Sequence, residues 1–177
     1  MEDDTVKGTI VAIKAVSIVQ GLMETFMAYR VGLAYYAYHM RMTAVNEIAP
    51  RIFVPETAKI AAFIFLGVCA LKFILAVANY KHASRRTDRT VESVNSHQQF
   101  MAKVSFVCVL ASAAAIWGLN VHKKSLPESQ SAAESVQKSV YVQIAVQLVG
   151  HYLMNSLHDQ ESKLSRIVDL RAHGAKL

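Results

Sequence analysis

Long apolar runs separated by short polar segments dominate the 177 residues of the chain. The run from Val104 to Val121 holds 18 residues without a charge, and the run from Ser139 to Leu157 holds 19. Runs of this length are typical of helices that cross a bilayer and are too long for buried strands. The pattern predicts four helices at about 8–38, 59–80, 102–121 and 133–158, followed by an amphipathic segment at 159–177.

The first predicted helix is longer than a bilayer requires. At ~1.5 Å per residue, 8–38 exceeds the ~30 Å thickness of the hydrocarbon core, so the helix should protrude or tilt. Pro50 and Pro55 mark the connection that follows it. Ser131 and Glu134 have capping-box spacing, which places the start of the fourth helix outside the bilayer. We therefore expect one all-α integral membrane domain with four transmembrane helices and short amphipathic helices in the loop and C-terminal regions.

A soluble four-helix bundle is the competing interpretation, because buried bundle helices also show long apolar stripes. Lys72 interrupts the second apolar run, and a charge at the centre of a membrane helix costs ~2.5 to 3.5 kcal/mol. A soluble bundle, however, needs a charged face on every helix. The uncharged third run has none, so the sequence favours membrane insertion.

The distribution of charge predicts the orientation. The chain has 19 Lys and Arg against 13 Asp and Glu, which gives a formal net charge of +6. With four spans, ten of the basic residues lie on the side of both termini and six in the two opposite connections. The positive-inside rule then places the termini on the cytoplasmic side or, in an organelle, on the matrix side. Basic residues do not alternate with aromatic ones, so we expect no nucleic acid as a partner.

The N-terminal residues Met1, Glu2, Asp3 and Asp4 are acidic where a signal or transit peptide would be basic. We therefore expect targeting to be internal, and we favour the mitochondrial inner membrane as the location.

Polar side chains recur along two of the predicted helices. At ~100° per residue, positions spaced by three and four residues form a stripe on one helix face. Two interpretations stay open: packing against other helices, or a polar cavity for a proton, a quinone head group, a lipid head group or a solute. The stripe of the first helix comprises Lys14, Ser17, Gly21, Glu24, Ala28, Gly32 and Tyr35, with Arg30 beside it, and that of the fourth comprises Ser139, Gln143, Gln147, His151 and Asn155.

Glu24 is the leading candidate for a functional side chain, since a carboxylate deep in a span must pair with a cation or take up a proton. Lys72 on the second helix is the expected intrachain partner. His151 offers a proton relay or a haem ligand, although haem with two histidine ligands needs a second His at matching depth. Cys69 and Cys108 lie inside apolar runs, so we expect them to pack rather than to form a disulfide.

No sequence motif of catalysis or of phosphate or metal binding is found. The segment from Arg85 to Arg89, together with His97, is expected to form a solvated connector between the second and third helices. Arg85, Arg86 and Arg89 are candidates to contact acidic lipid head groups there.

We expect a non-catalytic accessory subunit of a larger membrane complex, such as an organellar respiratory-chain or ATP-synthase assembly. Its partners would be other membrane subunits and lipids, with bound phospholipid and no required cofactor. One alternative is a small homo-oligomeric transporter or channel that uses Glu24 and His151. Another is a membrane anchor that handles quinone or lipid, in which haem or quinone would be bound.

Overall fold

The computed structural model describes residues 2–48, 56–85, 91–125 and 130–174, and all of these except Arg85 are α-helical. The four helices are α1 (Glu2–Ile48), α2 (Glu56–Ser84), α3 (Val91–Ser125) and α4 (Gln130–Gly174). No strand occurs among the residues described. The predicted all-α class is therefore confirmed.

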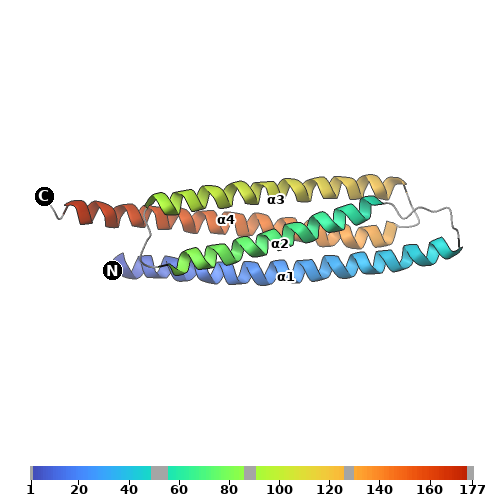
Figure 1. Cartoon of the computed structure of the whole chain (residues 1–177), viewed down its shortest axis with the longest axis horizontal. Coiled ribbons are helices and arrows are strands. Elements are labelled where there is room, and N and C mark those ends of the chain that lie inside the picture. The colour runs from blue at the N-terminus through green and yellow to red at the C-terminus, as the bar shows by residue number, and fades with distance from the viewer. Residues whose placement is uncertain (1, 49–55, 86–90, 126–129, 175–177) are drawn as a thin grey trace.

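The helices lie side by side and run alternately up and down in one elongated bundle (Figure 1). Each helix contacts the helix before or after it in the chain, and α4 closes the bundle against α1. Both ends of the chain lie at the same end of the bundle, which we call the terminus end (Figure 1). The C-terminal part of α4 projects there beyond the start of α3.

Buried positions on α2 and α3 recur at alternating steps of three and four residues. This spacing is the heptad pattern of helices that pack antiparallel along their length. It explains why the helices stay in contact from one end to the other. The buried residues at these steps are Ala61, Phe65, Val68, Lys72, Leu75 and Asn79 on α2, and Val94, Met101, Ser105, Cys108, Ser112 and Ala115 on α3. On α2, Ala62, Cys69, Ala76 and Ala83 are buried as well.

Three helices extend well beyond the expected bounds, and α1 does so at both ends, from Glu2 to Ile48. The third begins at Val91 rather than near 102, because the heptad of buried positions continues back to Val94. The fourth is continuous to Gly174, so the amphipathic segment expected from residue 159 onward extends α4 through that residue. Glu161 and Ser162 stay buried on the bundle side of α4, and this packing continues the helix. Pro50 and Pro55 lie outside the described residues.

Three helices are long and apolar enough to cross a membrane, through the stretches Lys7–Ala37, Lys59–Ser84 and Glu92–Gly118 of the described chain. This supports an integral membrane protein. The fourth helix is less apolar because the face that it buries holds Gln143, Gln147 and His158. Its exposed face includes Tyr141, Val142, Leu148, Val149, Tyr152 and Leu153.

Candidate functional site

A line of buried polar side chains follows the interior of the bundle, and we call it the polar seam. All four helices contribute to it, because each buries a polar residue at a heptad position. Its members are Ser17 and Glu24 on α1, Lys72 and Asn79 on α2, Ser105 and Ser112 on α3, and Gln143, Gln147, His158, Glu161 and Ser162 on α4.

The middle of the polar seam holds two ionisable side chains, Glu24 and Lys72, each only 1% exposed. The Nζ of Lys72 donates a hydrogen bond of 3.0 Å to the Oγ of Ser105. Lys72, Cys69 and Gln143 surround the carboxyl group of Glu24. Within the described chain, however, neither oxygen of Glu24 accepts a hydrogen bond of ordinary geometry. The expected pair thus interacts electrostatically, without a direct ion-pair contact.

The polar seam ends on the side away from the termini. Gln143 donates to the Sγ of Cys69, and the Oγ of Ser112 donates to the Oε1 of Gln147 at 3.5 Å. Beyond these contacts the interior is closed by a cluster of four buried apolar residues, which we call the apolar plug. The plug consists of Val31, Ala61, Phe65 and Ala115.

At the other end of the polar seam, two histidines share Asn79 as their hydrogen-bond acceptor. The Oδ1 of Asn79 lies 2.8 Å from the Nε2 of His97 and 3.4 Å from the Nε2 of His158. An amide oxygen only accepts, so both nitrogens must donate. The remaining ring nitrogen of His158, Nδ1, lies 3.3 Å from the Oε2 of Glu161. Since Nε2 of His158 already carries a hydrogen, this second contact requires a proton shared between His158 and Glu161.

Three imidazole rings from three helices meet at this point, and we call them the histidine cluster. His82 stacks on His97 with ring centroids 4.1 Å apart, and His97 meets His158 edge to face at 5.6 Å. His97 is half-buried within α3, so its expected place in a solvated connector is wrong. The sequence interpretation missed this cluster. The heptad of buried residues that starts at Val94 is the signal that would have placed His97 on a helix.

A small enclosed cavity lies between the histidine cluster and Lys72. Its volume is about 10 Å³, close to the space that one water molecule needs. The Oε1 of Gln20 is buried and has no hydrogen-bond partner in the described chain. The polar side chains that line the cavity are Gln20, Asn79, Ser105, His151 and Asn155.

The structure brings most of the residues predicted for the fourth helix to this interior. Gln143 and Gln147 are buried, while His151 and Asn155 are half-buried. The Nε2 of His151 lies 2.9 Å from the Nδ2 of Asn155. Because an amide nitrogen donates, His151 accepts at Nε2. Both side chains thus belong to the cavity and not to the outer surface.

The other predicted residues lie away from the polar seam. Lys14 is half-buried, with its Nζ 5.9 Å from the centre of the Tyr80 ring. Arg30 is exposed on the outer face of α1, and Arg85 is exposed just after α2. Arg86 and Arg89 lie outside the described residues.

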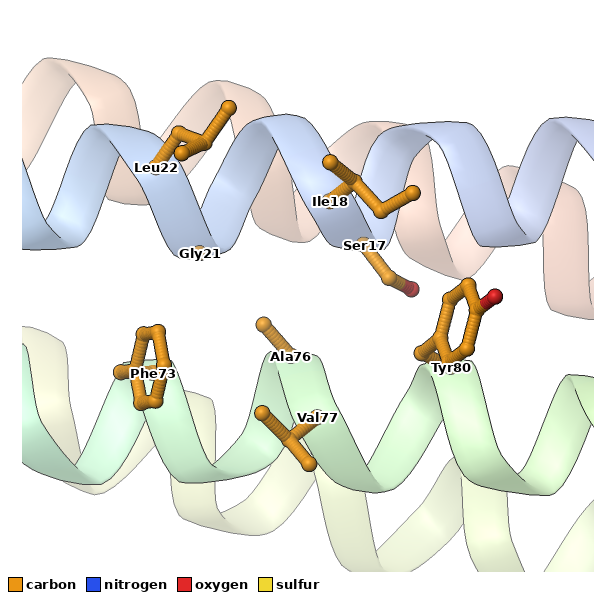
Figure 2. A pocket seen from close by; sticks show the side chains of 8 residues that line it. All are labelled: Ser17, Ile18, Gly21, Leu22, Phe73, Ala76, Val77 and Tyr80. Atoms are coloured by element: carbon orange, nitrogen blue, oxygen red, sulfur yellow. The ribbon is translucent and has the colours of Figure 1, made fainter.

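Two open apolar grooves run along the outer surface of α1. One has a volume of about 270 Å³ and separates α1 from α2, where Phe73 and Tyr80 flank Ala76 opposite Gly21 (Figure 2). The other has a volume of about 370 Å³ and lies between α1 and α4. Their apolar linings suit the acyl chains of lipids. They contribute no titratable group beyond the phenol of Tyr80.

The chemistry available inside the bundle is proton binding and proton transfer. Among the described residues no three His, Cys, Asp or Glu side chains are grouped to hold a metal ion. Cys69 and Cys108 are free thiols, and both are buried. The remaining interior groups are a carboxylate, an ammonium, imidazoles, amides and hydroxyls. All of them can donate or accept hydrogen bonds, and the carboxylate, the ammonium and the imidazoles can also exchange protons.

Comparison with protein-family models, with curated proteins and with solved structures finds no match to this chain.

Proposed function

We propose that the chain is a four-span, non-catalytic accessory subunit of a larger membrane assembly. The observation on which this proposal depends is Arg30, a basic side chain that points out of the bundle inside a membrane-crossing stretch.

The packing of α4 supports a fourth span. Its uncharged stretch lies beside the apolar stretches of two other helices, since Gly150 contacts Gln20 of α1 and Gln147 contacts Ser112 of α3. A helix that shares their depth must face the same solvent on its outside. The large apolar side chains exposed on α4, such as Leu148 and Val149, suit lipid at that depth.

The depth of Arg30 supports a partner. Val31, the next residue, packs in the apolar plug with Phe65 of α2, so Arg30 lies at the depth of that plug. Charged residues in membrane helices usually face a protein interior or a water-filled cavity. Arg30 faces outward and has no ion pair with any residue that the structure describes. A second protein is the environment that would satisfy its charge.

The surroundings of Arg30 indicate what this partner offers. Phe26, Tyr29 and Leu33 are all about half exposed or more on the same side of α1. A membrane helix that packs on these side chains would bring an acidic side chain to the guanidinium. Arginine binds a carboxylate through two parallel hydrogen bonds, which gives such a contact its specificity.

We rank the transporter alternative second. A transport path needs polar groups on both sides of Glu24, and the apolar plug closes the interior on one of those sides. The proposed location remains the mitochondrial inner membrane with the termini on the matrix side. Exposed basic residues at the terminus end, including Lys81, Arg85, Lys163 and Arg166, support that orientation.

Co-purification from the native membrane in mild detergent, followed by native gel electrophoresis, tests the proposal. We expect Arg30→Glu and Arg30→Gln to release the chain from a larger complex, while Arg30→Lys retains part of the association. Lys103→Gln is the matched control, because Lys103 is also basic and exposed but lies on α3. Migration of the wild-type chain only as a monomer or homo-oligomer would overturn the proposal. So would unchanged assembly of both Arg30 variants.

A further inference from the structure

We propose that the polar seam is a one-sided proton path, through which Glu24 exchanges a proton with the aqueous phase at the terminus end only. The inference rests on the interior of this chain and not on the partner proposed above. Five structural steps support it, from the surface inward to the apolar plug.

The path opens at the start of α3. The polar side chains of Glu92, Asn95, Ser96 and Gln99 form an open surface there on one face of α3. The Oδ1 of Asn95 accepts a hydrogen bond of 2.8 Å from the Oγ of Ser162. Ser162 is 7% exposed and directly follows the buried Glu161 on α4. One hydrogen bond thus joins this polar surface to the buried Ser162, which is the neighbour in sequence of Glu161.

The second step is the proton shared by His158 and Glu161. The Nδ1 of His158 takes up or gives up this proton, and its Nε2 faces Asn79. An imidazole that accepts a proton on one nitrogen can release one from the other, which makes it a relay. Asn79 accepts the hydrogen bond of Nε2 and also lines the cavity, so it holds Nε2 at the edge of the cavity, although its amide oxygen does not itself carry the proton.

The third step is a water molecule in the cavity. A cavity holds a water molecule where it has the volume of one water and offers two to four polar partners. The cavity meets both conditions, and the Oε1 of Gln20 supplies an acceptor that the protein leaves unsatisfied. A water bonded to Gln20 would also reach toward Ser105 and His151. It would connect the histidine cluster with the middle of the polar seam.

The fourth step passes through Lys72. Ser105 lines the cavity and accepts the hydrogen bond of Lys72. When the ammonium group of Lys72 leaves Ser105 and turns to the carboxylate of Glu24, it comes within reach to give a proton there, which leaves a neutral amine and a neutral acid. The amine then regains a proton from the water side through Ser105. The pair carries no net charge before and after this transfer, and once the amine regains its proton the site holds the single positive charge of Lys72 beside the neutral acid of Glu24.

The fifth step is the barrier. Val31, Phe65 and Ala115 fill the interior beyond the polar seam and offer no proton donor or acceptor on their side chains. Phe65 is fully buried, so its ring contacts other side chains and not solvent. Protons therefore reach Glu24 from the terminus end, and the seam does not conduct across the bundle.

The test uses the full chain in phospholipid vesicles and follows the infrared C=O band of protonated Glu24 after transfer from H2O to D2O. We expect Glu24→Gln to remove this band while circular dichroism shows an unchanged helix content. His158→Leu should slow the isotope shift of the band by about 100-fold, in the range expected when a proton relay is lost. Gln160→Leu is the control, because Gln160 is exposed on the same helix.

A double variant distinguishes loss of the proton relay from loss of folding. Adding Phe65→Ser to His158→Leu should restore fast exchange by admitting water from the opposite side. Three results would overturn the inference. The first is that, between mildly acidic and mildly alkaline buffer, the wild-type chain shows no C=O band that disappears in Glu24→Gln. The second is an unchanged exchange rate in His158→Leu, and the third is slow exchange in the double variant. Each is measured without a partner protein, so failure here is distinct from failure of the accessory-subunit proposal.

Discussion

Lys72 donates its hydrogen bond to Ser105 on α3, although the buried carboxyl group of Glu24 lies beside it on α1. The ammonium is thus held by a neutral hydroxyl while it remains the nearby cation for Glu24. In a low-dielectric interior such a pair interacts strongly even without contact. Three helices are thereby linked around one charged site.

A double-mutant cycle should reveal this link. Glu24→Gln leaves the ammonium of Lys72 without its counter-charge, and Lys72→Met leaves the carboxylate without its cation. We expect each single change to lower the free energy of unfolding by about 3 kcal/mol. The double variant should lose less than the sum, with a coupling of about 2 kcal/mol. Unfolding of the chain in detergent micelles measures all four stabilities, and additive losses would refute the coupling.

The apolar plug should be the most sensitive part of the core. Phe65 is fully buried among Val31, Ala61 and Ala115, so Phe65→Ala leaves a cavity that its neighbours cannot fill. We expect a loss of about 3 to 5 kcal/mol in the free energy of unfolding. Phe63→Ala is the matched control, because Phe63 is 57% exposed on the same helix. It should change stability by no more than about 0.5 kcal/mol, and equal losses would contradict this assignment of the core.

The helices themselves could be predicted from the sequence. Uncharged runs such as Val104 to Val121 have no strand-like alternation, and their length leaves helix as the only compact solution. The helix ends could not be predicted from hydropathy alone. The polar segment before Lys103 is helical because Val94 and Met101 continue the buried heptad, a signal of packing and not of hydrophobicity.

The arrangement of the polar residues could be predicted only in part. The spacing of Gln143, Gln147 and His151 places these residues near one face of a helix. No spacing within a helix shows that His97 and His158 share Asn79, because this depends on the register between α2, α3 and α4. That register is set by the sum of many apolar contacts, each of which is weak and nonspecific when considered alone.

The groove between α1 and α2 makes a prediction about Gly21. A Cβ atom built on Gly21 would lie 3.6 Å from Phe73 and 3.8 Å from the Cβ of Ala76, which is ordinary contact. Gly21→Ala should therefore fit and stabilise the bundle by about 0.5 to 1 kcal/mol through its higher helix propensity.

A larger side chain at the same position should have the opposite effect. Gly21→Leu would extend beyond the Cβ contacts and push Phe73 or α2 away, at a cost of about 1 to 3 kcal/mol. Gly32 is the control, since nothing lies within 4 Å of a Cβ atom there. Thermal unfolding in micelles should show that Gly32→Ala and Gly32→Leu are both tolerated. A tolerated Gly21→Leu would indicate that α1 and α2 are less closely packed than the structure shows.

The number of spans determines on which side each end of the chain lies. Four spans place both ends on one side of the membrane, whereas three spans place them on opposite sides. Cys69 and Cys108 are each 1% exposed, so they should react little with a membrane-impermeant maleimide. We expect Lys7→Cys and Gly174→Cys to be labelled from the same face of sealed vesicles, because α4 packs alongside the other helices at the same depth. Labelling from opposite faces would show that α4 does not cross the bilayer, and the lipid-facing assignment of Leu148 and Val149 would then be wrong.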